Sequence, residues 1–361
     1  MTRSEVEVVI VGAGIAGLIA AHQLTAAGVD VAVLEARAQA GGRVRSARDG
    51  AGQVVGDLGP TWVWPDVQPV AAAWLERLQL PMFAQHDDGL AIVELDAVRA
   101  PMRTQLPVQE GSMRLAGGTQ ALIDRLVAAL PPGAIVTGAP VTRMDAASER
   151  IAVSFGAGER ITAARVVVAT PPRIAAQLAW QPGLSPALAE ALAATPTWMA
   201  PHAKVAVHYA RAFWRERGLS GRLASRVGPL VEVHDHCGAR GEPAALFGFL
   251  GWPHPVRVAR GARLADDVAA QLRRCFGADA PAPLAITIED WAADPWVAVA
   301  ADRAGDGAHP EVRPGVLREA HLGGRVWFGA AETAERSPGL IEGALVAGER
   351  VAAAVLASRV R

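Results

Sequence analysis

The alternation of apolar and polar positions in the first fifty residues predicts a strand, a helix and a second strand. A β-branched run over 7–11 is typical of a buried parallel strand. Apolar residues at helical spacing then continue to Gly28, where the helix is expected to stop. A second apolar run over 29–34 ends in Glu35. This order is typical of the βαβ unit of an α/β fold.

Three glycines between the first strand and the helix suit a dinucleotide site. Gly12 permits a tight turn, Gly14 lets a pyrophosphate approach the backbone, and Gly17 lets the helix pack closely on the strand. The N-terminus of the helix offers amide donors and the positive end of its dipole to the phosphate. Glu35, 18 residues beyond Gly17, can accept hydrogen bonds from the adenosine ribose hydroxyls. Together these features predict a bound dinucleotide.

A second glycine-rich turn follows the acid and favours FAD over NAD. Gly41-Gly42-Arg43 comes shortly after Arg37. An arginine at such a turn can bind phosphate through two parallel hydrogen bonds. We therefore expect Arg37, Gly42 and Arg43 to close over the pyrophosphate. For the two arginines, ordinary solvated surface is the alternative.

Further along the chain, the hydrophobic pattern predicts alternating helices and strands without an internal repeat. Helices are expected over 70–78, 119–130, 266–276 and 340–357, and strands over 135–141, 151–155, 160–169, 203–209 and 244–250. The polar run His234-Asp235-His236-Cys237 reads as a solvated strand or loop, because alternating positions of an extended chain point to opposite faces. We expect no metal site there.

Composition and charge exclude several classes of protein. The chain has 361 residues, 51% of them hydrophobic, and a formal net charge of −1, which argues against nucleic acid or an anionic membrane as the partner. Two cysteines exclude a disulfide scaffold and a thiolate zinc site. The apolar stretch over 8–21 is too short and too rich in glycine to cross a bilayer, and no signal peptide is apparent. We expect a cytoplasmic protein without a membrane anchor.

One basic residue stands apart from the others. Of the 35 lysines and arginines, Lys204 is the only lysine. In a chain that has arginine at nearly every basic position, the position that keeps a lysine is expected to need an amine specifically. Chance survival is the alternative.

The segment from Val8 to Arg43 resembles the FAD-binding segment of the flavin-containing amine oxidase family, which includes monoamine and polyamine oxidases. It is also similar to the related desaturases and protoporphyrinogen oxidases. The resemblance implies an α/β fold: a glutathione-reductase-like Rossmann domain with a smaller, shortened α+β substrate domain. We expect the FAD-binding domain over 1–65, 113–195 and 288–361, and the substrate domain over 66–112 and 196–287.

The resemblance also assigns residues along the cofactor. The stretch that holds Gly59 and Thr61 would run beside the flavin ring, and the backbone of Val141 would contact adenine. Trp291 would pack by the isoalloxazine, with ordinary core packing as the alternative. Glu332 falls in an acidic turn near the ribityl phosphate. The last helix, with Ile341 at its start, would direct amides at the flavin pyrimidine edge, where negative charge gathers on reduction; a plain packing helix is the alternative.

At the reacting centre, the resemblance gives Lys204 the place of a lysine that is hydrogen-bonded through water to flavin N5. Trp62 would enter the substrate cavity, and Leu340 matches the second of two wall residues that are commonly aromatic. The first wall position, near Ala301, has no tyrosine, so the usual aromatic cage for an amine is missing. Trp62, Trp64 or Trp296 could replace it sterically. No cysteine occurs in this stretch, so we expect noncovalent FAD.

The activity implied is oxidation of an organic amine, a small-molecule substrate, by hydride transfer to flavin N5, with Lys204 as the catalytic residue and O₂ as the electron acceptor that yields H₂O₂. Two alternatives stay open. A flavin desaturase or dehydrogenase acting on C–C or ring C–H bonds fits the missing cage. A flavin-binding partner subunit without turnover is the other.

Overall fold

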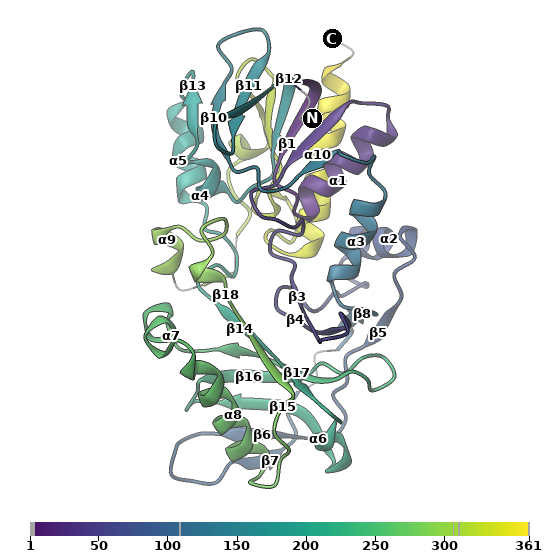
Figure 1. Cartoon of the computed structure of the whole chain (residues 1–361), viewed down its shortest axis with the longest axis vertical. Coiled ribbons are helices and arrows are strands. Elements are labelled where there is room, and N and C mark those ends of the chain that lie inside the picture. Colours follow the sequence, from purple (N-terminus) through teal and green to yellow (C-terminus); the bar gives the residue numbers. More distant parts are fainter. Residues whose placement is uncertain (1–3, 108–109, 306, 310, 360–361) are drawn as a thin grey trace.

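The computed structural model describes residues 4–107, 110–305, 307–309 and 311–359, and its strands there form two large sheets and two small two-stranded sheets. The large sheets lie at opposite ends of an elongated molecule, and both chain termini lie at the same end (Figure 1). Among the helices of these four ranges, none has both the length and the apolar character needed to cross a bilayer.

The nine-stranded sheet has a parallel centre in which β1 lies between β2 and β12. Alternate β1 side chains face two layers: Val8 and Ile10 pack with the helices, whereas Val9 and Val11 pack with the antiparallel strands. The strands are β1 (Glu5–Val11), β2 (Val31–Leu34), β9 (Ile135–Val136), β10 (Val141–Asp145), β11 (Ile151–Phe155), β12 (Glu159–Val168), β13 (Ala179–Gln181), β19 (Ala320–His321) and β20 (Val326–Phe328).

Helices α1 and α10 pack against each other beside this sheet (Figure 1). Their backbones approach closely because Gly348 has no side chain; a Cβ there would lie 2.6 Å from the carbonyl oxygen of Ala16. The helices of the molecule are α1 (Ile15–Ala26), α2 (Pro69–Arg77), α3 (Gln120–Ala128), α4 (Pro172–Ala175), α5 (Pro186–Ala194), α6 (Phe213–Glu216), α7 (His254–Arg260), α8 (Arg263–Phe276), α9 (Ala300–Arg303) and α10 (Ile341–Ser358), with short 3₁₀ turns η1 (Trp291–Ala293), η2 (Gly315–Arg318) and η3 (Ala331–Thr333).

The seven-stranded sheet has one face covered by α8 and one face turned toward the first sheet. Val205, Val207 and Leu246 belong to the core cluster that includes α8, whereas Lys204 and Phe247 lie on the opposite face. The strand order is β18 (Ala285–Asp290), β14 (Ala203–Tyr209), β17 (Ala244–Leu250), β16 (Leu230–Asp235), β15 (Leu219–Ser225), β6 (Leu90–Glu94) and β7 (Met102–Thr104).

A hairpin of β3 (Ser46–Arg48) and β4 (Val54–Asp57) packs on the open face of the second sheet. The contact is tight at Gly56, where a Cβ would lie 2.5 Å from the Cβ of Ala206. A further two-stranded antiparallel sheet pairs β5 (Met82–Ala84) with β8 (Met113–Leu115). The chain after β4 therefore runs directly over strand β14, and this places the stretch that holds Gly59 and Thr61 above Lys204.

Most sequence-predicted elements are present with small shifts at their ends, and strands 151–155, 203–209 and 244–250 have the predicted limits. The single strand predicted over 135–141 is wrong. It is divided into β9 and β10, which lie at different places in the sheet, because Gly138 turns the chain with a φ of 64°. The predicted domain limit at 287–288 falls inside strand β18.

Candidate active site

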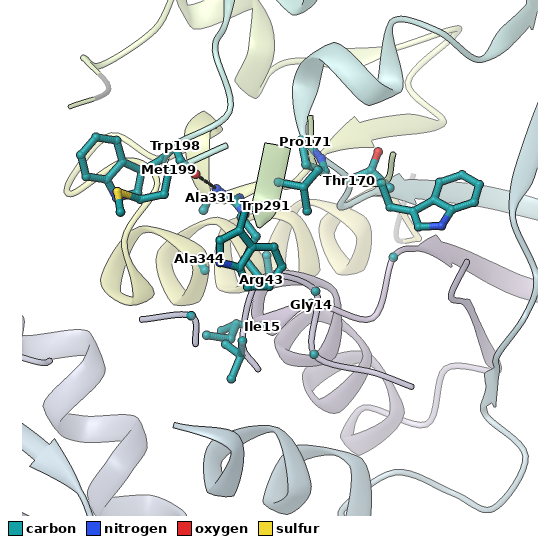
Figure 2. Close-up of a pocket in the computed structure, with 18 of the residues that line it drawn as sticks. Gly14, Ile15, Arg43, Thr170, Pro171, Trp198, Met199, Trp291, Ala331 and Ala344 are labelled. Atoms are coloured by element: carbon teal, nitrogen blue, oxygen red, sulfur yellow. Dashed lines mark hydrogen bonds between the residues drawn. The ribbon is translucent and has the colours of Figure 1, made fainter. Parts of the chain in front are cut away.

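A cavity of about 710 Å³ extends between the two sheets. Figure 2 shows part of its lining, including Gly14, Arg43 and Trp291. Most of the residues expected at a cofactor or substrate line it: Gly12, Gly14, Glu35, Arg37, Gly42, Arg43, Gly59, Thr61, Trp62, Val141, Lys204, Trp291, Trp296, Leu340 and Ile341. Gly17 and Glu332 lie behind this lining and support it.

At one end, glycines form a cradle that side chains would fill. A Cβ on Gly42 would lie 3.1 Å from the Cα of Gly14, and the φ of Gly12 is 99°. A Cβ on Gly17 would lie 2.0 Å from the carbonyl oxygen of Gly12, so only glycine permits this packing. Helix α1 begins directly after Gly14, and its first amides have no partners within the helix. This cradle fits a dinucleotide phosphate.

Two further polar groups of this end agree with a bound cofactor. The carboxylate of Glu35 is 4% exposed and accepts hydrogen bonds from the backbone N–H groups of Ala13 (2.8 Å) and Arg37 (2.9 Å), which hold it at the cavity wall. The hydroxyl of Thr170 is buried at the same wall without a hydrogen-bond partner among the described residues. Buried polar atoms are normally paired, so this hydroxyl suits a ligand atom.

The two arginines at the cavity are not ordinary solvated surface, because each is paired with an acid from the C-terminal part of the chain. Arg37 binds Asp294, with 3.1 Å from Nε to Oδ2. Arg43 binds Glu332 through two hydrogen bonds of 2.5 and 3.0 Å. Glu332 is fully buried and also accepts the backbone N–H of Trp198. Contact of these arginines with a pyrophosphate stays a prediction.

At the other end, the amine of Lys204 lies under the stretch that follows β4. Its Nζ donates to the carbonyl oxygen of Gly59 (2.6 Å) and to the hydroxyl of Thr61, and it lies 4.3 Å from the centre of the Phe247 ring. Burial lowers the pKa of Lys204 to about 7, with the charge of Asp57 opposing this effect. The side chain therefore changes its protonation state near neutral pH.

Aromatic side chains surround this end of the cavity. Trp62 donates its indole N–H to Gln85 (2.8 Å) and packs edge-on against His234 and Phe247. Trp291 is fixed by a hydrogen bond of 2.9 Å to the carbonyl oxygen of Leu58. The two tryptophans thus have fixed orientations, and they give the reacting end an apolar wall.

The prediction that residues 234–237 are solvated is wrong. His234, Asp235, His236 and Cys237 are at most 4% exposed. Their polar groups are paired inside the protein. Asp235 accepts two hydrogen bonds from Arg215 at 2.8 Å and one from the indole of Trp214, whereas His234 is hydrogen-bonded to Glu232, two residues earlier. The alternating pattern was misleading because this strand is internal to the sheet.

Sequence analysis missed a buried polar group next to Lys204. It consists of Asp57, His236 and Arg114, which are 1%, 4% and 3% exposed. The only sequence signal for it was a charged residue, Arg114, between apolar residues of a short strand.

Comparisons with known proteins agree with this geometry. A family model described as flavin containing amine oxidoreductase matches residues 75–356, and one for NAD(P)-binding Rossmann-like domains matches residues 10–78. Among solved structures, cyclohexylamine oxidase from Brevibacterium oxydans has a TM-score of 0.82 at 20% identity, covering 99% of this chain and 100% of that one. Putrescine oxidase bound to putrescine has a TM-score of 0.77 at 20% identity, covering 98% and 99%. These likenesses confirm the expected fold class.

Similar sequences include enzymes for two kinds of substrate. An L-amino acid dehydrogenase from Synechocystis is 26% identical over 67% of this chain and 50% of its own length. A putrescine oxidase from Kocuria rosea is 38% identical over 35% of this chain and 26% of its own length. The chain thus spans half or less of these relatives.

Neither cysteine is available to attach a cofactor. Cys237 and Cys275, both in the described part of the chain, are buried outside the cavity lining. Burial raises the pKa of each thiol to about 12, so both are unreactive at neutral pH. FAD is therefore held without a covalent bond to cysteine.

Proposed function

Because the chain belongs to the family of flavin-containing amine oxidoreductases, we propose that it oxidises an apolar amine with noncovalently bound FAD. FAD held by the glycine cradle at Gly12 and Gly14 and by Glu35 would supply a two-electron acceptor for the hydride equivalent on the carbon beside the amine nitrogen. Water would hydrolyse the imine to a carbonyl compound and ammonia, and O₂ would take the two electrons, with two protons, to form H₂O₂. The protein's own groups orient the substrate, exclude water and hold a proton beside the ring.

The observation that carries the choice of substrate is that, among the described residues lining the cavity, both arginines are already paired with carboxylates and the single ammonium is already hydrogen-bonded to the chain. Three lysines and arginines occur among the described residues that line the cavity. Arg37 and Arg43 are paired with Asp294 and Glu332, and Lys204 is held by Gly59 and Thr61. A substrate carboxylate would have to leave water without a partner, which costs a few kcal/mol. This supports an amine over an α-amino acid.

The wall of the cavity supports an apolar substrate. Trp62, Trp64, Phe249 and Leu340 line it, and Trp296 lies at its surface with 37% of its area exposed. These side chains offer no ionised group to a substrate, so the gain on binding comes from burying hydrocarbon. Trp62 and Trp296 would then occupy the place of the aromatic cage that positions 301 and 340 lack.

Lys204 is suited to the proton-handling part of this reaction. An ammonium has three donors, and two of them are used by Gly59 and Thr61, which leaves one for a water beside the flavin ring. A pKa of about 7 lets this group hold or release a proton at neutral pH. We propose this water-linked contact with N5 as the role of Lys204.

A matched pair of compounds tests the substrate class. Phenethylamine and L-phenylalanine differ by one carboxylate, so purified holoprotein is incubated in air with each, and H₂O₂ and ammonia are measured. We expect kcat/KM to be about 100-fold higher for the amine, from the cost of an unpaired carboxylate. Equal or faster turnover of the amino acid would reject the assignment.

The missing cage at 301 and 340 favours a second candidate, a flavin desaturase or dehydrogenase acting on C–C or ring C–H bonds. This candidate differs from the first in the oxidative half of the cycle. Flavin that has been reduced chemically would react with O₂ slowly in a dehydrogenase and rapidly in an oxidase. Stopped-flow mixing of reduced holoprotein with oxygenated buffer separates the two.

A further inference from the structure

We propose that Asp57, His236 and Arg114 form a buried relay that positions Lys204 and determines how readily its amine releases a proton. The three side chains come from strand β4, from the residue after β16 and from strand β8. None of them lines the cavity, so they are positioning residues that act through Lys204. Their catalytic importance rests on the proposed function, but the relay itself is a property of the protein without substrate.

Asp57 fastens the stretch that holds the amine. One oxygen, Oδ1, accepts hydrogen bonds from the hydroxyl of Ser46 (2.7 Å) and from the backbone N–H of Thr119 (3.0 Å). The chain then continues directly to Gly59 and Thr61, the two partners of Lys204 Nζ. Asp57 thus joins the start of α3 to the stretch above the amine and fixes where the amine lies.

The other oxygen of Asp57 meets a histidine whose tautomer follows from its neighbours. His236 Nδ1 lies 2.8 Å from a guanidinium N–H of Arg114, which can only donate, so Nδ1 carries a lone pair. Nε2 lies 3.2 Å from both the carboxylate Oδ2 and the backbone N of Asp57. Because Nδ1 accepts from Arg114, the single ring proton of neutral His236 is on Nε2 and is directed to Oδ2. Burial and then the charge of Arg114 lower the pKa of His236 to about 4. His236 is thus a neutral connector at neutral pH.

The charges of this group leave Lys204 poorly compensated. Burial raises the pKa of Asp57, but the hydrogen bonds from His236 and Ser46 outweigh it and leave the pKa at about 2, so Asp57 is ionised. Arg114 is also buried, and it is linked to the carboxylate of Asp57 by the ring of His236. It donates further hydrogen bonds to the carbonyl oxygens of His236 and Cys237. The carboxylate of Asp57 therefore lies within electrostatic reach of two buried cations, Arg114 and Lys204.

Other charged groups face Lys204 from the neighbouring strands. Glu289 lies opposite Lys204 on β18 and is paired with Arg45 at 2.6 Å. Glu232 lies two strands away on β16, beyond Phe249, and is hydrogen-bonded to His234 at 2.6 Å. Both carboxylates are thus occupied by their own partners. We expect Asp57 to influence Lys204 most, Glu232 less and Glu289 least.

The test measures the protonation of Lys204 in holoprotein without substrate. The visible flavin spectrum is recorded from about pH 5 to about pH 10, and the transition that Lys204→Met abolishes belongs to this amine. In the parent protein we expect its midpoint near 7. Asp57→Asn removes the negative charge and should move the midpoint down by about one unit or more, whereas Arg114→Gln should move it up. The matched control Glu289→Gln should leave the midpoint in place.

Opposite shifts support the relay, since a general loosening of the fold would move both midpoints in the same direction. Shifts of equal sign, an unmoved midpoint in Asp57→Asn, or a parent without a Lys204-dependent transition would each overturn it. If Asp57→Asn does not fold, Arg114→Gln is compared with the charge-conserving Arg114→Lys. An upward shift in Arg114→Gln that Arg114→Lys lacks supports the relay, and equal shifts in the two variants overturn it. Because the titration uses no substrate, it tests the relay even if the protein does not oxidise amines.

Discussion

At the residue scale, the lone lysine of the chain lies at a buried place where an amine has a property that arginine lacks. A guanidinium stays protonated under all ordinary conditions, whereas a buried amine releases its proton when its surroundings favour the neutral form. The pKa of Lys204, lowered by burial to about 7, shows this effect. The composition of the chain therefore agrees with the chemistry of the site.

This burial predicts a pH-dependent effect of Lys204→Met on stability. Between pH 7 and pH 10.5, the unfolded chain binds more protons at Lys204 than the folded chain, so the stability of the parent rises with pH across this window. Methionine removes the penalty of a buried charge. The difference in free energy of unfolding between Lys204→Met and the parent should therefore be more favourable to the variant at pH 6 than at pH 10. The change between the two pH values should be on the order of 4 kcal/mol.

Urea unfolding of the parent and of Lys204→Met at both pH values measures the difference. The comparison of the two pH values cancels the constant contribution of the methionine side chain. A difference between the two proteins that does not change with pH would show that Lys204 stays protonated in the folded protein at both pH values, as it is in the unfolded chain.

The cradle residues Gly12, Gly14 and Glu35 could be predicted because local spacing encodes them, whereas Lys204 and Trp291 were assigned from the resemblance to a family. The turn at Gly12 and Gly14 depends on a short strand and on the helix that follows it. The relay could not be predicted in this way. Asp57 and His236 are 179 residues apart in sequence, and Arg114 comes from a third strand, so their contact follows from how the sheets pack.

At the element scale, the path of the chain depends on a few close backbone contacts. Helix α1 packs on strand β1 and against α10, and glycine is required at both contacts. The predicted strand over 135–141 failed for a related reason. Its apolar residues were recognised, but the positive φ of Gly138 divides them between two strands.

Gly17→Ala is expected to abolish FAD binding or to unfold the region around α1. The added Cβ would lie 2.0 Å from the carbonyl oxygen of Gly12, so the turn that forms the cradle must move. Gly50→Ala is the matched control, because a Cβ there meets nothing within 4 Å. The FAD content of each purified protein is measured by absorbance. A full complement of FAD in Gly17→Ala would contradict the close packing of α1 on the turn.

At the scale of the whole molecule, ion pairs join the first fifty residues to the last third of the chain. Arg37 and Arg43 near the start bind Asp294 and Glu332, and all four side chains are at most 23% exposed. The cavity is thus closed by contacts between distant segments. The sequence predicted a role for both arginines from the glycine-rich turn beside them. It could not predict their acidic partners, because these lie more than 250 residues further along the chain.

Arg43→Met is expected to destabilise the protein by about 3–5 kcal/mol, because it leaves the fully buried carboxylate of Glu332 without its cation. Arg48→Met serves as the control. The pair of Arg48 with Asp124 is about half exposed, and such pairs contribute about 0–1 kcal/mol. Urea denaturation compares the two variants with the parent, and equal losses would contradict the structural importance of the buried pair.

The most direct test of amine oxidation is a single turnover without oxygen. Purified yellow holoprotein is mixed anaerobically with excess phenethylamine or cyclohexylamine, and the flavin absorbance is followed. We predict complete loss of the yellow colour, with one carbonyl product and one ammonia released for each flavin. A flavin that stays oxidised with every amine, although dithionite bleaches it, would contradict the proposed function.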